Sequence, residues 1–404
     1  MKWEKVKLGD LYTVHNGLSK GKKFFGTGFP FLSFSIVFNK WFIPEQLYDL
    51  VEVDEKERNS YSIKKGDVFI TRTSETMEEL GMSTVALKDY PNATYNGFTK
   101  RLRPITELLE PRFIGYYLRT PEFRGKFMAF SAMTTRASLT NDDLLSLEVP
   151  VPPLPIQQRI ASILSAYDDL IENNQKQIKL LEEAAQRLYK EWFVDLRFPG
   201  HEGVKVVDGV PEGWSRTRLD EVIEFNPKVS LTKERIKEFV PMSALSNTAM
   251  ILDTNEITYT QSNSGSKFKN DDTIMARITP CLENGKIAFV QELKSEEGAV
   301  GSTEYIVLRS RLLCPSMVYL LSRMQDFRKY AINNMSGSDG RQRVKVERLM
   351  EYEYLKPTND LVCEFSSKVT PMFKNIKHLS KLNAILREAR DRLLPKLMSG
   401  EIEV

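Results

Sequence analysis

The chain contains the same unit twice. Matching stretches follow one another in the same order in both halves, at an offset of about 205 residues. The matched positions are Lys65–Arg72 and Asn270–Arg277, Phe123 and Phe327, Arg136 and Arg341, Leu144 and Leu349, Pro152 and Pro357, and Arg187 and Arg392. Before them, Trp3 and Trp214, which are 211 residues apart, are each followed five residues later by a leucine. Solenoid repeats are far shorter, at about 50 residues or fewer. The 404 residues therefore predict two copies of one larger unit, each with a core of its own.

Each unit has a globular part followed by a helical part. In the globular part, short apolar runs bounded by Gly, Asp and Asn are typical of strands, as at Val68–Thr71 and Thr303–Leu308. Phe113–Arg119 and Met317–Met324 have helical spacing. The sequence thus predicts an α+β fold with two α/β globular domains.

The helical part follows a proline-rich breaker at residues 151–155. Apolar residues then recur about every 3.5 positions, which favours a coiled-coil seam between the two copies. We expect the seam and partner interface at Ile160, Ile163, Tyr167, Leu170, Leu181, Leu188, Phe365, Met372, Leu379, Leu382, Leu386 and Leu393. Asn174, Gln177 and Asn375 are expected to form a polar layer, and Pro371 to kink or break the second helix. The alternative is two amphipathic helices, each docked on its own domain.

The length of the connection decides the direction of the helices. A helix over residues 156–196 would be ~60 Å long. The link from Arg197 to Trp214 reaches at most ~60 Å when fully stretched, so parallel helices would leave it no slack. We therefore expect two long antiparallel helices separating the domains in a pseudo-twofold tandem repeat. The expected segments are 1–150 (first domain), 151–198 (first helix), 199–213 (linker), 214–356 (second domain) and 357–404 (second helix).

Composition gives no support to an enzyme. The chain has three histidines, no HExxH zinc motif and no GxxxxGK(S/T) phosphate loop. We assign no catalytic residue and no metal ligand. The net charge is only +3, from 57 basic and 54 acidic residues, so a nucleic-acid surface must come from local clustering. Scattered cysteines and the lack of a long apolar run predict a cytoplasmic chain without a membrane span.

Several stretches carry a resemblance to a known family. Residues 268–286 resemble the central motif of one class of target recognition domain, and Gly301–Tyr305 follows it as expected. Pro152–Ile160 is similar to the start of a conserved helix, and Leu397–Ile402 to a characteristic C-terminal ending. Gly28–Leu32 resembles a strand entry of such domains. The chain resembles the specificity subunit of a type I restriction–modification system over essentially its whole length.

Two departures separate the halves. The first domain has Thr73-Ser74-Glu75 where the second has residues 278–281, Ile-Thr-Pro-Cys. The second helix starts at residues 359–362 without the Gln-Gln pair of the first. The two halves are therefore expected to differ in their partner contacts.

The resemblance implies a DNA-binding subunit without chemistry of its own. Each globular domain would read one half of an asymmetric bipartite target in double-stranded DNA. The helices would set the spacer and hold two methyltransferase subunits, with two restriction/translocase subunits joining for cleavage. S-adenosylmethionine, ATP and Mg²⁺ would be bound by those partners.

Polar and basic residues in loops are the candidate DNA contacts. Arg, Asn and Gln suit base edges, whereas Lys and Thr suit phosphates. In the first domain they are Lys22, Lys23, Thr73, Ser74, Asn96, Thr134, Thr135 and Arg136. In the second domain they are Thr279, Asn284, Lys286, Ser302, Thr303, Ser338, Arg341 and Gln342. Arg72 and Arg277 occupy a shared position, which favours a structural role, and Arg101 and Arg103 fit the outer face of a strand.

Two other classes of function fit the sequence less well. A methyltransferase would need an Asn/Asp-Pro-Pro-aromatic loop, and Asn226-Pro227-Lys228 lacks the second Pro and the aromatic. A structural coiled-coil linker would have no nucleic-acid role. DNA binding and methyl transfer by the purified protein separate these hypotheses from a specificity subunit.

Overall fold

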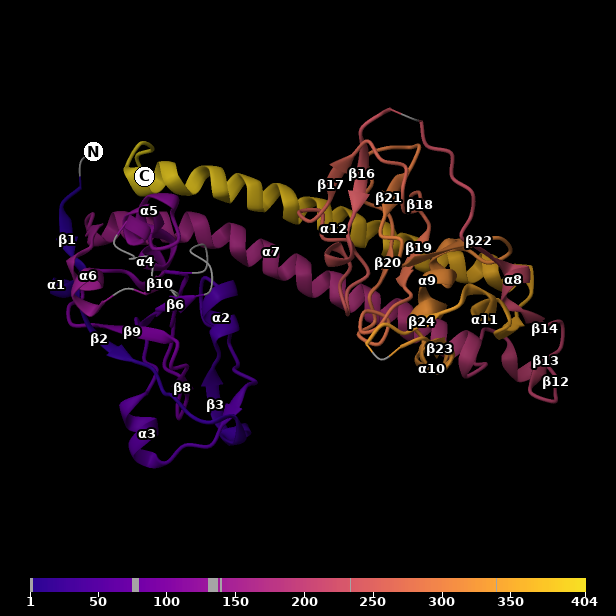
Figure 1. Cartoon of the computed structure of the whole chain (residues 1–404), viewed down its shortest axis with the longest axis horizontal. Helices are drawn as coiled ribbons and strands as arrows, with labels where there is room; N and C mark the ends of the chain where they lie inside the picture. Colours follow the sequence, from indigo (N-terminus) through magenta and orange to yellow (C-terminus); the bar gives the residue numbers. More distant parts are fainter. Residues whose placement is uncertain (1–2, 75–79, 130–136, 139, 233, 339) are drawn as a thin grey trace. The chain divides into compact units, whose positions relative to one another are not determined.

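A computed structural model describes residues 3–74, 80–129, 137–138, 140–232, 234–338 and 340–404 (Figure 1). The chain divides into two compact units. The first comprises Met1–Ile171 and Ile385–Val404, and the second comprises Glu172–Ala384. Each unit therefore contains one globular domain and a segment of both long helices.

The first unit is built around a four-stranded antiparallel sheet. Its order is β2 (Tyr12–Asn16), β9 (Thr99–Pro104), β5 (Val68–Thr71) and β7 (Ser83–Val85). A second sheet has the order β4 (Leu50–Val51), β3 (Phe25–Leu32) and β8 (Thr94–Tyr95). Two ribbons pair β1 (Lys5–Lys7) with β11 (Glu148–Pro150), and β6 (Thr73–Ser74) with β10 (Ala137–Ser138). The short helices are α1 (Leu8–Leu11), α2 (Phe34–Asn39), α3 (Glu55–Ser60), α4 (Pro111–Tyr117), α5 (Pro121–Ala129), α6 (Asn141–Ser146) and the 3-10 turn η1 (Lys22–Phe24).

The second unit repeats this plan. Its main sheet has the order β15 (Ile223–Phe225), β22 (Tyr305–Ser310), β19 (Thr273–Ala276) and β20 (Ile287–Phe289). The other sheet has the order β17 (Thr258–Thr260), β16 (Lys237–Val240), β21 (Ala299–Gly301) and β18 (Ser266–Phe268). Ribbons pair β12 (Val206–Val207) with β13 (Val210–Pro211), β14 (Ser215–Arg218) with β25 (Glu353–Lys356), and β23 (Met335–Ser336) with β24 (Arg343–Val344). The short helices are α8 (Leu219–Val222), α9 (Pro315–Arg323), α10 (Gln325–Asn333), α11 (Val346–Met350) and the 3-10 turns η4 (His201–Gly203) and η5 (Met242–Ala244).

The two main sheets confirm the duplication. Strands β2, β9, β5 and β7 correspond in order and in pairing to β15, β22, β19 and β20. In each domain the first and last strands pair with each other, as β1 with β11 and β14 with β25. Each globular domain is therefore closed where it meets its helix.

Two long helices, α7 (Leu154–Tyr189) and α12 (Asn359–Ser399), pack against each other, and η3 (Lys190–Val194) extends α7 by a π-helical turn (Figure 1). Their partners run in opposite directions. Asp168 pairs with Arg390, Asn174 with Asn383, and the ring of Tyr189 lies 6.0 Å from that of Phe365. The antiparallel arrangement predicted from the linker length is confirmed.

The register of the seam differs from the prediction. Leu170, with 51% of its surface exposed, lies outside the seam, whereas Ile171 is 7% exposed. Gln177 and Ala184 are likewise exposed, while Ile178 and Ala185 are buried. At these three positions the buried residue lies one position later than predicted, whereas Ile160 and Asn174 are buried where they were predicted to be. The predicted positions Ile160 and Phe365 are fully buried, and the positions that are partly buried are Ile163, Tyr167, Leu181, Leu188, Met372, Leu379, Leu386 and Leu393.

Three further expectations for the second helix are wrong. Leu382 is 44% exposed, and its neighbour Asn383 is buried instead. Asn375 is exposed, so the polar layer joins Asn174 to Asn383, with the Asn174 Nδ2 donating to the Asn383 Oδ1 at 2.9 Å. Pro371 does not break α12. It lies on the exposed face of the helix, while Val369 and Phe373 anchor the buried face.

Each domain completes its core with the helix pair. In the first unit, Ile160 and Leu164 of α7 and Leu394 and Leu397 of α12 join the residues beneath the β2–β9–β5–β7 sheet. In the second unit, Tyr189 of α7 and Phe365 of α12 belong to the core of the second globular domain. None of the helices in the described part of the chain is long and apolar enough to cross a membrane.

The buried Asn174–Asn383 hydrogen bond makes a prediction about stability. Asn174→Ala leaves the Asn383 amide buried without its partner and is expected to lower the free energy of unfolding by about 1–3 kcal/mol. The double variant Asn174→Leu with Asn383→Leu replaces both amides and is expected to be more stable than either single leucine variant. Urea unfolding followed by circular dichroism gives the coupling energy of the cycle. Strictly additive effects of the two single substitutions would contradict the pairing.

Candidate nucleic-acid interface

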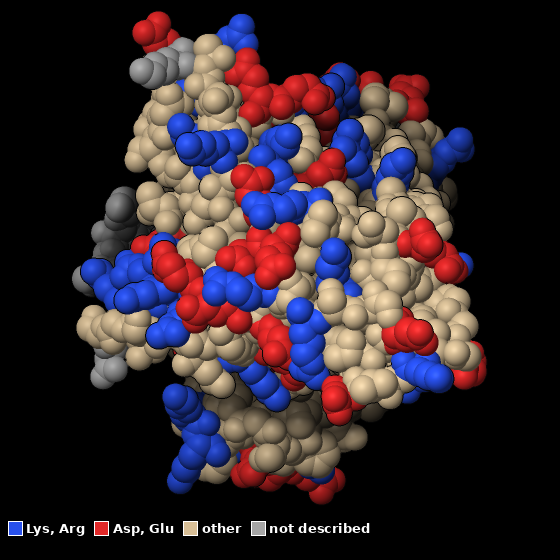
Figure 2. All heavy atoms as spheres, turned by 90° about the vertical axis from the view of Figure 1, so that its right-hand side faces the viewer, with Lys and Arg blue, Asp and Glu red and all other residues tan. Residues whose placement is uncertain are grey.

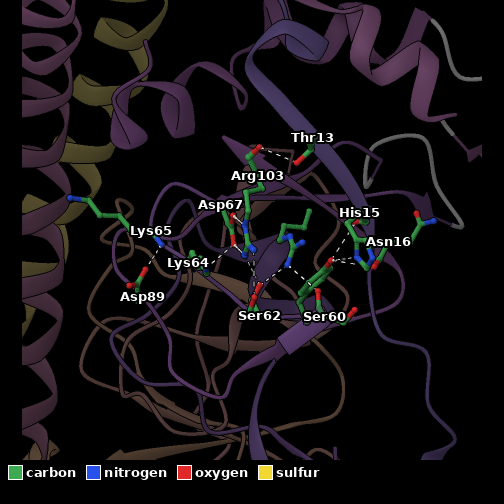
Figure 3. A network of polar contacts seen from close by, with 12 residues as sticks. Thr13, His15, Asn16, Ser60, Ser62, Lys64, Lys65, Asp67, Asp89 and Arg103 are labelled. Carbon is green, nitrogen blue, oxygen red and sulfur yellow. Dashed lines mark hydrogen bonds and ion pairs between the residues drawn. The ribbon is translucent and has the colours of Figure 1, made fainter. Parts of the chain in front are cut away.

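A buried ion pair ties together the central strands of each main sheet. In the first domain, the fully buried Asp67 precedes β5, and Arg103 on β9 donates to it through Nε at 2.8 Å and Nη2 at 2.6 Å (Figure 3). The backbone N–H of Lys64 also donates to this carboxylate, at 2.7 Å. These hydrogen bonds raise the pKa of Arg103 above its ordinary value. The pair satisfies a carboxylate that would be costly to bury alone.

The second domain repeats this ion pair. Asp272 precedes β19 and is fully buried, and Arg309 on β22 donates to it through Nε and Nη2, both at 2.7 Å. The Lys269 N–H supplies the third bond at 2.8 Å. Arg103 is therefore a structural residue of the sheet and not part of a solvent-facing strand surface.

Arg101 is also directed inward. It is 7% exposed, donates to the Ser62 carbonyl at 2.7 Å, and lies over the ring of Tyr95 at 5.4 Å. The Tyr95 hydroxyl in turn contacts the His15 Nδ1 at 3.0 Å. Figure 3 shows this network linking the loop at Ser60 and Ser62 to the end of β2 at His15 and Asn16. The expectation that Arg101 lies on an outer strand face is therefore wrong.

Arg72 and Arg277 end the central strand of their domains in the same way. The Arg72 N–H donates to the Phe98 carbonyl at 3.0 Å, and the Arg277 N–H donates to the Glu304 carbonyl at 2.9 Å. The Nε atom of each guanidinium is buried without a hydrogen-bond partner among the described residues. Both arginines thus lie beneath the turn that precedes β9 or β22.

Two of the candidate DNA contacts shape those turns. The Asn96 Oδ1 accepts from the Phe98 N–H at 2.7 Å, and the Ser302 Oγ accepts from the Glu304 N–H at 3.1 Å. Such short polar side chains stabilise turns by bonding to the backbone two residues on. Asn96 and Ser302 occupy equivalent positions, so their side chains serve the fold of the turn.

In the second domain, the structure brings several candidates together. The Thr279 N–H donates to the Gln342 carbonyl at 3.0 Å. Arg343, next to Gln342, holds Glu304 with its Nε at 3.0 Å and its Nη2 at 2.7 Å. The turn that carries Ser302 and Thr303 is thereby fixed beside the segment that carries Arg341 and Gln342. Thr303, Ser338 and Arg341 are exposed.

Other candidates lie elsewhere. The Lys286 ammonium donates to the Met242 carbonyl at 2.8 Å, and Asn284 is exposed in the preceding turn. Lys22 and Lys23 are exposed on η1, with Lys23 5.0 Å from the Phe24 ring centre. Thr73 and Ser74 pair with β10 through their backbone. Thr134, Thr135 and Arg136 lie outside the described residues.

Sequence reasoning missed Phe98 and Arg343. Phe98 is 57% exposed at the tip of the first-domain turn, where the second domain has Glu304 held by Arg343. The repeat offset of 205 gave no signal, because it places Phe98 opposite Thr303, and only the strand pairing places Phe98 opposite Glu304. The two domains thus present different chemistry on the same scaffold.

Acidic and basic side chains are intermixed on the face of the molecule drawn in Figure 2. This agrees with a net charge of +3. Among the described residues, no group of His, Cys, Asp or Glu is arranged to hold a metal ion.

A second network joins the first domain to its helices. The Tyr116 hydroxyl donates to the Asp168 Oδ2, Asp168 pairs with Arg390, and the Arg390 guanidinium lies 5.0 Å from the ring centre of Trp41. Burial, reinforced by the Asp168 charge, raises the pKa of Tyr116 well above its ordinary value, so the hydroxyl stays a donor. The domain is therefore attached to the helix pair by polar contacts as well as by its apolar core.

The family model of the type I restriction modification DNA specificity domain matches residues 1–183. The specificity subunit of the type I restriction enzyme MjaIX from Methanocaldococcus jannaschii is 25% identical over 100% of this chain and 94% of its own length. That of HindI from Haemophilus influenzae is 24% identical over 99% of both chains. The chain belongs to the family of type I restriction–modification specificity subunits.

The fold agrees with this assignment. The crystal structure of the S subunit from M. genitalium aligns with a TM-score of 0.57 at 16% identity, covering 98% of this chain and 96% of that one. Specificity subunits are non-catalytic members of their complexes, and the cofactors of these systems are bound by other subunits. This specificity subunit is accordingly a recognition and assembly component.

The Glu304–Arg343 pair predicts a pH-dependent contribution to stability. The hydrogen bond from Arg343 lowers the pKa of Glu304 below the ordinary value for a glutamate. Its contribution is therefore present above about pH 4.5 and lost as the pH falls through the lower folded-state pKa. Glu304→Gln is expected to cost up to about 1 kcal/mol at pH 7 and nothing at low pH, measured by thermal unfolding.

The matched control is Glu351→Gln, because the ion pair between Glu351 and Arg348 is local and joins residues three apart at the end of α11. A destabilisation by Glu304→Gln that stays constant across the acid range would contradict the predicted role of the pair.

Proposed function

We propose that this specificity subunit reads an asymmetric bipartite target in double-stranded DNA, with one globular domain per half-site. The reading domains are residues 1–150 and 214–356. The observation that carries the proposal is a shared frame with different turns. Both domains have the same strand order and the same buried Asp–Arg pair, yet Phe98 faces solvent where Glu304 is tied to Arg343. A common scaffold with divergent turns favours two readers of unlike sequences.

The candidate contacts fall into two kinds. Exposed Arg341 and Thr303, together with Gln342, lie near one another in the second domain and suit base edges or phosphates. Lys22 and Lys23 suit phosphate contacts because they are exposed and carry no ion pair in the described part of the chain. We further propose that the helix pair holds two methyltransferase subunits and that two restriction/translocase subunits complete the assembly. S-adenosylmethionine, ATP and Mg²⁺ would be bound by those partners. Leu170 and Leu382, which the seam leaves exposed, are candidate contacts for the methyltransferase.

Domain exchange tests the assignment of one reader to each half-site. The β1–β11 ribbon closes the first domain on itself, so residues 1–150 can be replaced as a block by the corresponding domain of another specificity subunit. Methylome sequencing of cells that also carry the partner subunits should show one altered half-site and one unchanged half-site. A change in both half-sites, or in neither, would overturn the two-reader proposal.

A heptad insertion tests whether the helices set the spacer. One heptad added to α7 after Ile171 and one to α12 after Ala384 preserves the antiparallel register of the seam. Each helix lengthens by about 10 Å, or about three base pairs at ~3.4 Å per step, so the preferred spacer should grow by about that amount with the half-sites unchanged.

The matched control places the same heptad in the turn between β12 and β13. That turn is closed by Asp208 and Gly209, with φ of 50° and 75°, so an insertion there extends an exposed loop and leaves both helices intact. A spacer that lengthens with the control insertion, or does not respond to the paired insertion, would remove the helices as the ruler.

A further inference from the structure

The second domain contains a cleft that none of the sequence motifs indicates. It has a volume of about 520 Å³ and lies between the loop after β15, strand β18 and the end of β19. Its lining includes Lys228, Lys267, Arg277, Thr303 and Tyr305, and no Asp or Glu is among the described residues that line it. Three cationic side chains therefore border a hollow whose described lining contains no carboxylate.

The walls of the cleft are fixed by hydrogen bonds. The Asn226 N–H donates to the Val307 carbonyl at 2.7 Å, and the Val307 N–H donates to the Asn226 Oδ1 at 3.0 Å, which pins the loop that carries Lys228. The Ser266 Oγ donates to the Tyr305 carbonyl at 3.1 Å, which pins β18 beside β22. Gly265 adopts a φ of +119°, and a Cβ there would lie 2.2 Å from the Gly301 carbonyl oxygen. The cleft is thus formed before any ligand arrives.

Two of the residues that line the cleft carry a buried polar atom without a partner within the described protein. Tyr305 is 2% exposed, and its hydroxyl is buried without a hydrogen bond. The Nε atom of Arg277 is likewise buried without a hydrogen-bond partner among the described residues. The nearby Glu304 forms its side-chain hydrogen bonds with Arg343, although its charge also acts on Arg277. Buried donors without partners are rare in proteins and are a sign that a ligand or water completes them.

In the first domain the Nε of the equivalent Arg72 is also without a partner, but another atom of its guanidinium has one. Arg72 donates through Nη1 to the Asn16 Oδ1 at 3.4 Å. Next to Asn16, the rings of His15 and Tyr61 lie 5.5 Å apart, and Tyr61 packs on Tyr95 at 5.9 Å. Arg72 therefore has a side-chain partner within its own domain, next to this group of packed rings.

We propose that the cleft binds a phosphate group and that, within the function proposed above, a phosphodiester of the DNA half-site contacted by the second domain supplies it. A guanidinium presents paired donors that match phosphate oxygens, and lysines add charge without demanding a fixed geometry. The lining offers donors and cations in excess of acceptors, which suits a phosphate better than a base edge. The contact would position this domain on the DNA without reading its sequence.

The test compares Lys267→Gln and Tyr305→Phe with wild type in the full chain bound to its methyltransferase partner. Lys205→Gln is the control, because Lys205 is exposed in the segment before β12 and lies outside the cleft. Fluorescence anisotropy measures binding to duplexes with and without the target over a range of salt concentrations. Lys267→Gln should weaken both by roughly 3- to 10-fold and reduce the salt slope by about one. Tyr305→Phe should weaken binding to both duplexes by a smaller factor than Lys267→Gln, and the control should match wild type.

The outcomes separate this inference from the proposed function. If wild type distinguishes target from unrelated DNA but Lys267→Gln binds with unchanged affinity and slope, the cleft proposal is overturned alone. If Lys267→Gln loses affinity for the target duplex alone, the cleft proposal is also overturned, since that result indicates reading of bases. If wild type shows no preference for target, both proposals fail. Calorimetric titration with inorganic phosphate completes the test: binding that Lys267→Gln abolishes, with DNA affinity unchanged, would assign the cleft to a free anion and overturn the DNA assignment.

Discussion

The antiparallel pairing of α7 with α12 is the constraint on which both globular domains depend. Each domain completes its apolar core with the beginning of one helix and the end of the other, so neither core is closed without the pair. The Asn174–Asn383 hydrogen bond admits one register, because a shift along the seam would bury two amides against aliphatic side chains. The two halves of the chain are therefore joined by this fixed helix pairing as well as by the covalent linker.

Within each domain, a buried carboxylate holds the central strands of the main sheet together. Asp67 and Asp272 each precede a central strand and accept three hydrogen bonds, two from an arginine on the neighbouring strand. Removing either partner would leave a buried charge uncompensated, which is far more costly than losing a surface pair. These ion pairs fix the main sheet beneath the turns, so the sequences of the turns can differ between the two domains.

The difference between the domains is concentrated where the central strands end. Arg72 and Arg277 occupy one shared position, yet Arg72 bonds to Asn16 and Arg277 borders an open cleft. Beside them, Phe98 is exposed and Glu304 is paired. A recognition protein built by duplication needs this combination of a repeated scaffold and independent surfaces. The same combination explains why neither domain requires a high net charge.

The sequence by itself determined the large features. The repeat offset predicted two equivalent domains, because residues that serve the same fold recur in the same order. The linker length predicted antiparallel helices, because chain reach is a covalent limit. The motifs at residues 152–160 and 268–286 indicated the family before any geometry was known.

Tertiary structure decided which side chains face inward. Leu170 and Ile171 are both aliphatic and adjacent, so heptad spacing alone cannot select the buried one, and the packing partner does. Arg101 and Arg103 alternate with Leu102 as a solvated strand face would, yet Asp67 and Ser62 draw both inward from other segments. The cleft around Arg277 is assembled from loops about 80 residues apart in sequence, at Asn226 and Thr303. Long-range pairing of this kind leaves no periodic trace in the chain, because it depends on where the backbone folds back and not on local spacing.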